Sequence, residues 1–313
     1  MKKIIINNSV LIGEEITIGE NLVIGNGNMI LASRIRIGSN VTVGSNNNVL
    51  IGENFELGDT TSFGNNNLIE GKSVFIGENV WWGDENVLGN GGKWNARSNF
   101  YLGSFSMVVG KCIFNLSDQI NIGEDVGIGG EVNIWTHGVY LPILMGYPSQ
   151  FGPVIIGDHV WLPSRSIVLP NISIGSNVVI GINSLINKNI PNGCLAAGIP
   201  IRIIKTNAYP NQNHNMNEDI IHDILKEYEE LKTYKGIDLK ISYLADKEII
   251  LCNNKEFNLK NMIFPEELTS EEEDFRDYLR RKGIKFFGKK PFKSILPSKI
   301  LKLKEFYEQN KKN

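Results

Sequence analysis

One period dominates the sequence: an aliphatic residue recurs at every sixth position through residues 156–186. The positions are Ile156, Leu162, Val168, Ile174, Ile180 and Ile186. A period of six fits neither a helix, which repeats about every 3.6 residues, nor a strand with alternating faces. It is typical of a parallel β-helix, in which short strands form flat walls and three walls make one coil. The repeat therefore predicts a mainly β solenoid.

The same period begins near the N-terminus and changes phase several times. It runs through Ile12-Gly13, Ile37-Gly38, Ile76-Gly77 and Ile122-Gly123, with one-residue slips between phases. It weakens between residues 89 and 118. At about 18 residues a coil, residues 10–200 predict roughly ten coils that must fold as one array. The extra residues between Ile134 and Ile156 predict a loop within 138–153, whose apolar composition favours an interaction role.

The repeat gives way to a different pattern in the last third of the chain. We predict a β-helix domain at 1–205, a polar linker at 206–216 and a small α+β domain at 217–313. In that domain we expect helices from Asn217 (as N-cap) to Tyr234, over 270–282 and over 298–309, with strands at 238–244 and 248–252.

Composition excludes several classes of protein. The 313 residues hold 32 Lys and Arg against 34 Asp and Glu, a net charge of −2, which does not suggest a nucleic-acid-binding protein. The apolar run at the N-terminus stops at Asn7, too early for a signal peptide, and no stretch is long enough to span a membrane. Cys112, Cys194 and Cys252 are too far apart for a zinc or disulfide pattern. We therefore expect a cytoplasmic protein without a metal site.

A histidine stands directly before the predicted loop. Because Ile134 belongs to the inward-facing row, alternation predicts that Glu131, Asn133, Trp135 and His137 face outward. An exposed imidazole next to a loop is suited to general-base catalysis, and Glu131 or Asn133 could orient it. The alternative is a histidine with no catalytic role, which is the commoner case for a lone surface histidine.

Four motifs in order resemble one known family. They are His137, the run Ile156-Gly157-Asp158-His159-Val160-Trp161, the run Leu169–Gly175, and Ala197-Gly198-Ile199-Pro200-Ile201-Arg202. This region resembles the hexapeptide-repeat sugar O-acetyltransferases of the maltose and galactoside acetyltransferase group. The resemblance implies a left-handed parallel β-helix and a homotrimer with active sites between neighbouring prisms. It also implies acetyl-CoA as donor, a saccharide acceptor and direct transfer in a ternary complex, with His137 as the base.

The resemblance also implies roles for other residues. Trp161 would lie at the donor end of the site, and Arg202 and Lys205 would contact the nucleotide phosphates of acetyl-CoA. The full donor set is Trp161, Gly181, Ala197, Gly198, Pro200, Arg202 and Lys205. For the acceptor we expect Trp135, Tyr140 and Tyr147. Making surface polysaccharide or lipooligosaccharide is the role that this activity would serve.

Three other functions are compatible with the same pattern. The first is N-acetylation of a nucleotide-linked amino sugar, which would use the same coil and histidine. The second is a trimeric zinc carbonic anhydrase, although only His137 and His159 lie within the coils. The third is a β-helix that serves only as a scaffold. A basic run between Arg280 and Lys293, interleaved with phenylalanines, suggests either a contact for an anionic acceptor or an ordinary solvated face.

Overall fold

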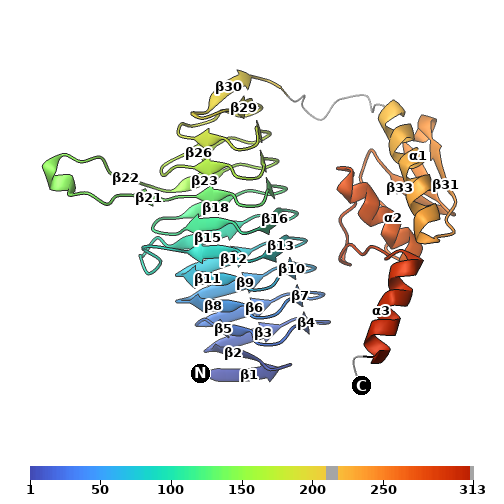
Figure 1. Cartoon of the computed structure of the whole chain (residues 1–313), viewed down its shortest axis with the longest axis horizontal. Coiled ribbons are helices and arrows are strands. Elements are labelled where there is room, and N and C mark those ends of the chain that lie inside the picture. The colour runs from blue at the N-terminus through green and yellow to red at the C-terminus, as the bar shows by residue number, and fades with distance from the viewer. Residues whose placement is uncertain (209–217, 311–313) are drawn as a thin grey trace. The chain divides into compact units, whose positions relative to one another are not determined.

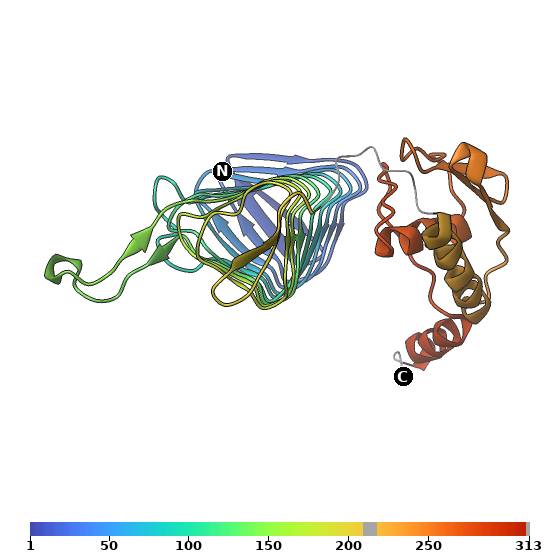
Figure 2. The same ribbon diagram turned by 90° about the horizontal axis from the view of Figure 1, so that it is seen from above.

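The computed structural model describes residues 1–208 and 218–310, which form two compact units, Met1–Gln212 and Asn213–Asn313. The first unit is a three-sided prism of short parallel strands (Figures 1 and 2). The second unit holds three helices and a three-stranded sheet. The predicted fold class, a left-handed parallel β-helix of hexapeptide repeats with a small C-terminal α+β domain, is confirmed. Residues 209–216 of the predicted linker and the predicted N-cap Asn217 lie outside the described residues.

Three sheets, here called A, B and C, form the walls of the prism. Sheet A has ten strands, of which β1 is antiparallel: β1 (Lys2–Ile6), β2 (Ser9–Gly13), β5 (Met29–Leu31), β8 (Asn48–Ile51), β11 (Leu68–Gly71), β14 (Val87–Gly89), β17 (Ile113–Asn115), β20 (Asn133–Ile134), β25 (Ile167–Val168) and β28 (Leu185–Ile186). Sheet B has eight: β3 (Glu15–Ile18), β6 (Arg34–Ile37), β9 (Asn54–Leu57), β12 (Ser73–Ile76), β15 (Asn99–Leu102), β18 (Ile120–Ile122), β23 (Val154–Ile156) and β26 (Ser173–Ile174).

Sheet C has ten strands and carries the end of the unit. Its strands are β4 (Val23–Ile24), β7 (Thr42–Val43), β10 (Ser62–Phe63), β13 (Trp81–Asp84), β16 (Met107–Gly110), β19 (Gly127–Ile128), β24 (Trp161–Leu162), β27 (Val179–Ile180), β29 (Leu195–Ala197) and the antiparallel β30 (Arg202–Lys205). The chain visits A, B and C in turn. Sheet A then has nine parallel strands, one coil fewer than the repeat predicts, because two loops outside the coils use part of the chain.

The sixth-position residues fill the interior of the prism. Ile156, Leu162, Val168, Ile174, Ile180 and Ile186 are all buried, as the repeat predicts. Aromatic rings fill the middle coils, where Trp82 stacks on Phe63 with ring centroids 5.8 Å apart. At one corner, buried asparagine side chains form a ladder of hydrogen bonds. The amide of Asn67 donates to Asn47 at 2.9 Å, and the indole N–H of Trp82 donates to Asn67 at 3.0 Å. The interior is thus mainly apolar, and its buried polar side chains pair with one another or, as Thr61 and Ser166 do, donate to backbone carbonyl oxygens.

Residues with left-handed backbone turn the chain at the corners. Asn21, Asn40 and Asn79 recur at the corner from B to C, and Asn46 and Asn66 at the corner from C to A, all with φ between 54 and 59°. Asparagine tolerates this conformation better than most residues. The corner geometry therefore explains why asparagine stands at these five positions.

Both loops that leave the coils start at the corner from sheet A to sheet B. The first, residues 90–98, joins β14 to β15. The second is a hairpin of β21 (His137–Gly138) and β22 (Gln150–Phe151), with the short 3-10 helix η1 (Ile143–Met145) at its tip. The hairpin points away from the prism (Figure 2). Tyr140 and Leu144 are 97% and 98% exposed, so the tip packs against nothing in its own unit.

The C-terminal unit contains α1 (Glu218–Lys235), β31 (Ile241–Leu244), η2 (Ala245–Lys247), β32 (Ile249–Cys252), β33 (Lys255–Asn258), α2 (Ser270–Arg281) and α3 (Ser298–Asn310). The third strand, β33, was not predicted from the sequence, because its four residues show a single buried position, Phe257. Thr269 and Glu272 form a capping box at the start of α2. No helix in residues 1–208 or 218–310 is long and apolar enough to cross a membrane.

Most of the basic run in this unit is engaged within the unit itself. Arg280 and Arg281 both pair with Asp277, at 2.7 and 3.2 Å. Phe286 is buried, and Lys282 pairs with Glu227 at 2.6 Å. The run is therefore a structural feature of this unit, and these contacts favour the solvated-face interpretation over a contact with an anionic acceptor.

Candidate active site

His137 lies where the chain leaves sheet A for the hairpin, and its ring is held from one side. Nδ1 is 2.7 Å from Oδ1 of Asn115 and 2.9 Å from Oγ of Ser117. Asn115 and Ser117 belong to the preceding coil. The ring of Phe151 stacks on the imidazole with centroids 6.0 Å apart, because Phe151 pairs with His137 across the hairpin. The imidazole is half-buried.

The partners of the two contacts fix the tautomer of a neutral His137. Asn115 donates its amide nitrogen to the carbonyl oxygen of Asn90, which can only accept, so Oδ1 is the atom that faces the imidazole. Ser117 donates its hydroxyl to the carbonyl oxygen of Gly91 at 3.1 Å, which leaves Oγ as an acceptor. Nδ1 therefore carries the proton, and the lone pair of the ring is on Nε2.

The loop 90–98 covers the corner beside this imidazole. Gly91 has φ +100°, and a Cβ there would lie 2.9 Å from Cε1 of His137. Two ion pairs anchor the loop to the coils: Lys93 with Glu70, and Arg97 with the buried Asp118 at 2.6 Å. Only a residue without a side chain leaves the edge of the ring accessible at this point.

The contacts of the His137 ring are with residues other than Glu131 and Asn133, the two that were predicted to orient it. Glu131 has φ +62° and turns the corner from sheet C to sheet A, one strand before the corner of His137. Its carboxylate pairs with Arg165 of the next coil at 2.9 Å. Asn133 donates to the backbone oxygen of Glu131. From residue 131 to 137, buried and less buried positions alternate as the sequence predicts.

Sequence reasoning missed Asn115, Ser117 and the loop 90–98. The sequence did carry one signal for them, since the repeat weakens between residues 89 and 118. A weak repeat indicates that a wall is interrupted, but it does not say which polar side chains face the interruption. The pairing of β17 with β20 supplies that information, because it stacks Ile113 and Phe114 under Asn133 and Ile134.

The residues predicted for the donor gather on sheet C. Trp161, on β24, is 56% exposed on the outer face and lies over Gly127, whose added Cβ would be 3.5 Å from the indole. Ala197 on β29 pairs with Arg202 on β30. Gly181 follows β27, and Gly198 and Pro200 lie in the turn between β29 and β30. Arg202 and Lys205 are exposed and take part in no ion pair within the described residues.

The residues predicted for the acceptor lie around the histidine corner. Trp135 is half-buried at the end of sheet A, next above Asn115 in the stack. Tyr140 and Tyr147 are exposed on the hairpin. The predicted acceptor residues thus surround the corner from A to B, whereas the predicted donor residues lie on sheet C, the opposite wall of the same prism.

Two other chemistries, zinc catalysis and nucleophilic catalysis by a cysteine thiol, find little support among the described residues. His137 and His159 lie at different corners, and His159 pairs with Asp125 at 3.2 Å. The described part of the chain contains no group of three or more His, Cys, Asp or Glu side chains placed to hold a metal ion. Burial raises the pKa of the Cys112 thiol, which donates to the carbonyl oxygen of Gly129. A protonated buried thiol is a poor nucleophile at neutral pH.

Fold and site define the class: a hexapeptide-repeat β-helix with a polar pocket for one histidine at a corner. No family model matches the chain. Among curated proteins it is similar to the galactoside O-acetyltransferase of Escherichia coli, with 34% identity over 88 residues, 28% of this chain and 43% of the relative. It is also similar to a putative lipopolysaccharide biosynthesis O-acetyl transferase of Escherichia coli, with 46% identity over 99 residues, 28% and 50% respectively. Over 28% of its length the chain is thus similar in sequence to two sugar-modifying O-acetyltransferases, the class that its motifs resemble.

The chain spans about half the length of the curated relatives that it matches. Among solved structures it is similar to a polysialic acid O-acetyltransferase, with 20% identity, a TM-score of 0.44 and coverage of 70% of this chain and 97% of that one.

Proposed function

We propose that this protein is an acetyl-CoA-dependent O-acetyltransferase that acts on a hydroxyl group of a saccharide. The observation that carries the proposal is the fixed tautomer of His137, which presents an unprotonated Nε2 beside the loop 90–98. The names of its relatives, a galactoside and a lipopolysaccharide O-acetyltransferase, supply the substrate class.

His137 acts as the general base in this proposal. Nε2 takes the proton of the acceptor hydroxyl while its oxygen forms a bond to the acetyl carbonyl carbon. The carbon–sulfur bond then breaks, and the proton passes from the imidazolium to the thiolate of coenzyme A. Asn115 and Ser117 accept hydrogen bonds from Nδ1–H throughout the reaction. They therefore hold the ring in place and stabilise its charged form. No covalent enzyme intermediate is required.

The wall formed by sheet C suits the donor. Gly181, Ala197 and Gly198 leave a backbone surface without bulky side chains, against which an extended pantetheine arm can lie. Arg202 and Lys205 add two positive charges at the end of the same wall, where the nucleotide phosphates would bind. Trp161 lies two strands nearer the middle of the prism, about 10 Å from β29 at the usual strand spacing.

A complete site in this proposal needs two copies of the chain. The base is at the corner from A to B and the donor wall is on sheet C, so one prism cannot bring them together. The outer face of sheet A offers a surface for association, because its outward row is largely apolar: Val10, Met29, Leu68, Val87, Ile113, Ile167 and Leu185. We infer a homotrimer in which the histidine corner of one copy faces sheet C of the next.

The test is an assay of the purified protein with acetyl-CoA and a panel of saccharides. We expect free coenzyme A to appear together with a product that loses its acetyl group in mild base, as an ester does. A base-stable product, formed only with amino sugars, would instead indicate N-acetylation. Absence of transfer to every saccharide would contradict the proposal.

A further inference from the structure

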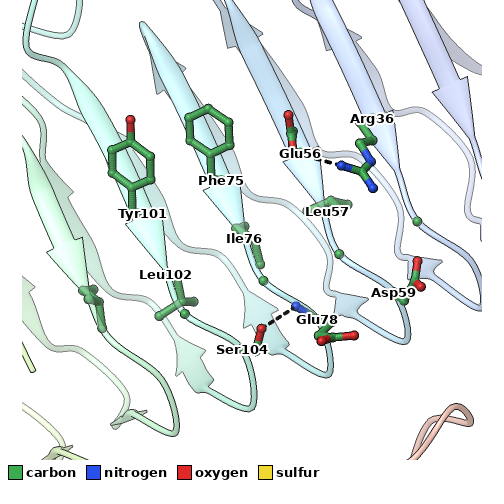
Figure 3. Close-up of a pocket in the computed structure, with 15 residues that line it drawn as sticks. Arg36, Glu56, Leu57, Asp59, Phe75, Ile76, Glu78, Tyr101, Leu102 and Ser104 are labelled. Carbon is green, nitrogen blue, oxygen red and sulfur yellow. Dashed lines mark hydrogen bonds and ion pairs between the residues drawn. The ribbon is translucent and has the colours of Figure 1, made fainter. Parts of the chain in front are cut away.

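The outer face of sheet B carries a groove that the proposed reaction does not use. The sheet-B groove has a volume of about 510 Å³ and lies over β6, β9, β12 and β15, where these strands turn toward sheet C. Its lining includes Arg36, Glu56, Asp59, Phe75, Glu78 and Tyr101. Figure 3 shows the side chains of Glu56, Phe75 and Tyr101 side by side on neighbouring strands.

An aromatic pair forms the apolar part of the groove. The rings of Phe75 and Tyr101 are stacked, with centroids 4.9 Å apart and planes 4° apart, because β12 pairs with β15 in register. Tyr101 is exposed and Phe75 is half-buried, although the coils do not need either ring for their core. Polarised C–H groups are attracted to the negative face of an aromatic ring, and the faces of pyranose rings consist of such C–H groups.

Charged groups surround the aromatic pair and give the groove a net negative charge. Glu56, Asp59 and Glu78 bring three carboxylates, against the single guanidinium of Arg36, which lies 3.8 Å from Glu56. Carboxylates accept hydrogen bonds from hydroxyl and ammonium groups and repel other anions. The groove is therefore suited to neutral sugars or amino sugars and unsuited to acidic ones.

The groove and the histidine corner lie at opposite ends of the sheet-B strands, the groove where these strands turn toward sheet C and His137 where sheet A turns toward sheet B. β15 links the two places, because it starts directly after the loop 90–98, whose Gly91 lies beside the ring of His137. Tyr101 is two strands from β23, the strand that follows the hairpin, which is about 10 Å at the usual spacing. A saccharide chain with one unit at His137 can thus reach the aromatic pair along sheet B.

We propose that the sheet-B groove binds the distal units of an oligomeric or polymeric acceptor made of neutral or amino sugars. The inference rests on the proposed transfer to a saccharide, and it adds that this saccharide is a chain of several units. The groove would raise the affinity for long acceptors and leave transfer to a single sugar unchanged.

The test separates binding from turnover. We would probe an array of neutral, amino and acidic oligosaccharides of one to eight units with the His137→Ala protein, which keeps the groove but lacks the base. We expect retention of neutral or amino-sugar oligomers of several units. Phe75→Ala and Tyr101→Ala should each weaken that binding about tenfold, the order of one aromatic contact. The control is Trp81→Ala, an exposed aromatic residue of the same coil on sheet C, which should bind normally.

Folding of each variant would be checked by its melting temperature. Binding of acidic oligomers only, equal binding by all variants, or no binding by any protein would overturn the inference. Failure of the proposed function would be seen in a different experiment: the native protein would transfer no acetyl group to short or long saccharides.

Discussion

The histidine corner and sheet C belong to the same coils but are built in different ways. Sheet C is not interrupted by loops: the strands of Trp161 and Ala197 pair in parallel register, and only the last pairing, in which Arg202 lies opposite Ala197, is antiparallel with a register shift. At the corner from A to B, two loops interrupt the hexad, and His137 depends on Asn115 and Ser117 of another coil. The comparison suggests that the regular wall can hold a substrate common to many proteins, whereas the irregular corner determines the chemistry and the choice of acceptor.

The largest expected effect comes from removing the base. His137→Ala should lower kcat by about 10³, within the usual range for general-base catalysis, and leave the affinity for coenzyme A unchanged. Steady-state kinetics and calorimetry with coenzyme A measure the two quantities. His159→Ala is the matched control, since His159 pairs with Asp125 at another corner. Normal turnover by the His137→Ala protein would refute the mechanism.

Mixed oligomers test whether the two regions meet between copies. One chain carries His137→Ala, and the other carries Trp161→Ala with Arg202→Ala and Lys205→Ala. Each alone should be nearly inactive when acetyl-CoA is kept well below the raised KM of the second variant. When the two chains are co-expressed in equal amounts and assemble at random, about a quarter of the sites combine an intact histidine corner from one copy with an intact sheet C from the next. About a quarter of native activity should then return. No recovery in purified mixed oligomers would place base and donor on the same copy.

The next effect concerns the residue that positions the base. Asn115→Leu removes the acceptor for the Nδ1 proton and should lower kcat about 10- to 100-fold, with the KM for acetyl-CoA unchanged. Asn115→Asp keeps an acceptor and should retain more activity than Asn115→Leu. It should also move the acidic limb of the pH–rate profile to higher pH, because a carboxylate stabilises the protonated imidazole. Equal kcat values for the two variants would show that Asn115 has only a structural role.

The smallest effect comes from charges on the regular wall. Arg202→Ala with Lys205→Ala should raise the KM for acetyl-CoA about tenfold at low salt and leave kcat nearly unchanged. The effect should shrink as ionic strength rises, because both side chains are exposed. Lys3→Ala, a charge at the other end of the prism, is the control. A fall in kcat with unchanged KM would mean that these residues do not act through donor binding.

The sequence predicted the walls well because each wall depends on a local repeat. Leu162, Val168 and Ile174 are buried as expected, and the predicted helix over 270–282 appears as α2 (Ser270–Arg281). Local signals specify these features: six-residue spacing for the coils, and the capping box of Thr269 and Glu272 for α2. The short strand β33 offered no such signal.

The same difference between local and long-range signals applies to the candidate site. His137 and the candidate donor residues could be proposed from the sequence because motifs place them in order along the chain. Glu131 and Asn133 were predicted to orient His137 from alternation alone, which gives the face on which a side chain lies but does not identify its contacts. Asn115 and Ser117 lie 22 and 20 residues before His137, and only the stacking of coils brings them to it.

The sequence by itself therefore determined the period, the apolar interior and the position of His137 beside a loop, because each depends on neighbours within a few residues. Tertiary structure decided which nitrogen of a neutral His137 is free, which loop covers it, and that His137 and the residues predicted for the donor lie on opposite sides of one prism. These features depend on contacts between successive coils, and the register of those coils is fixed only when the whole array packs.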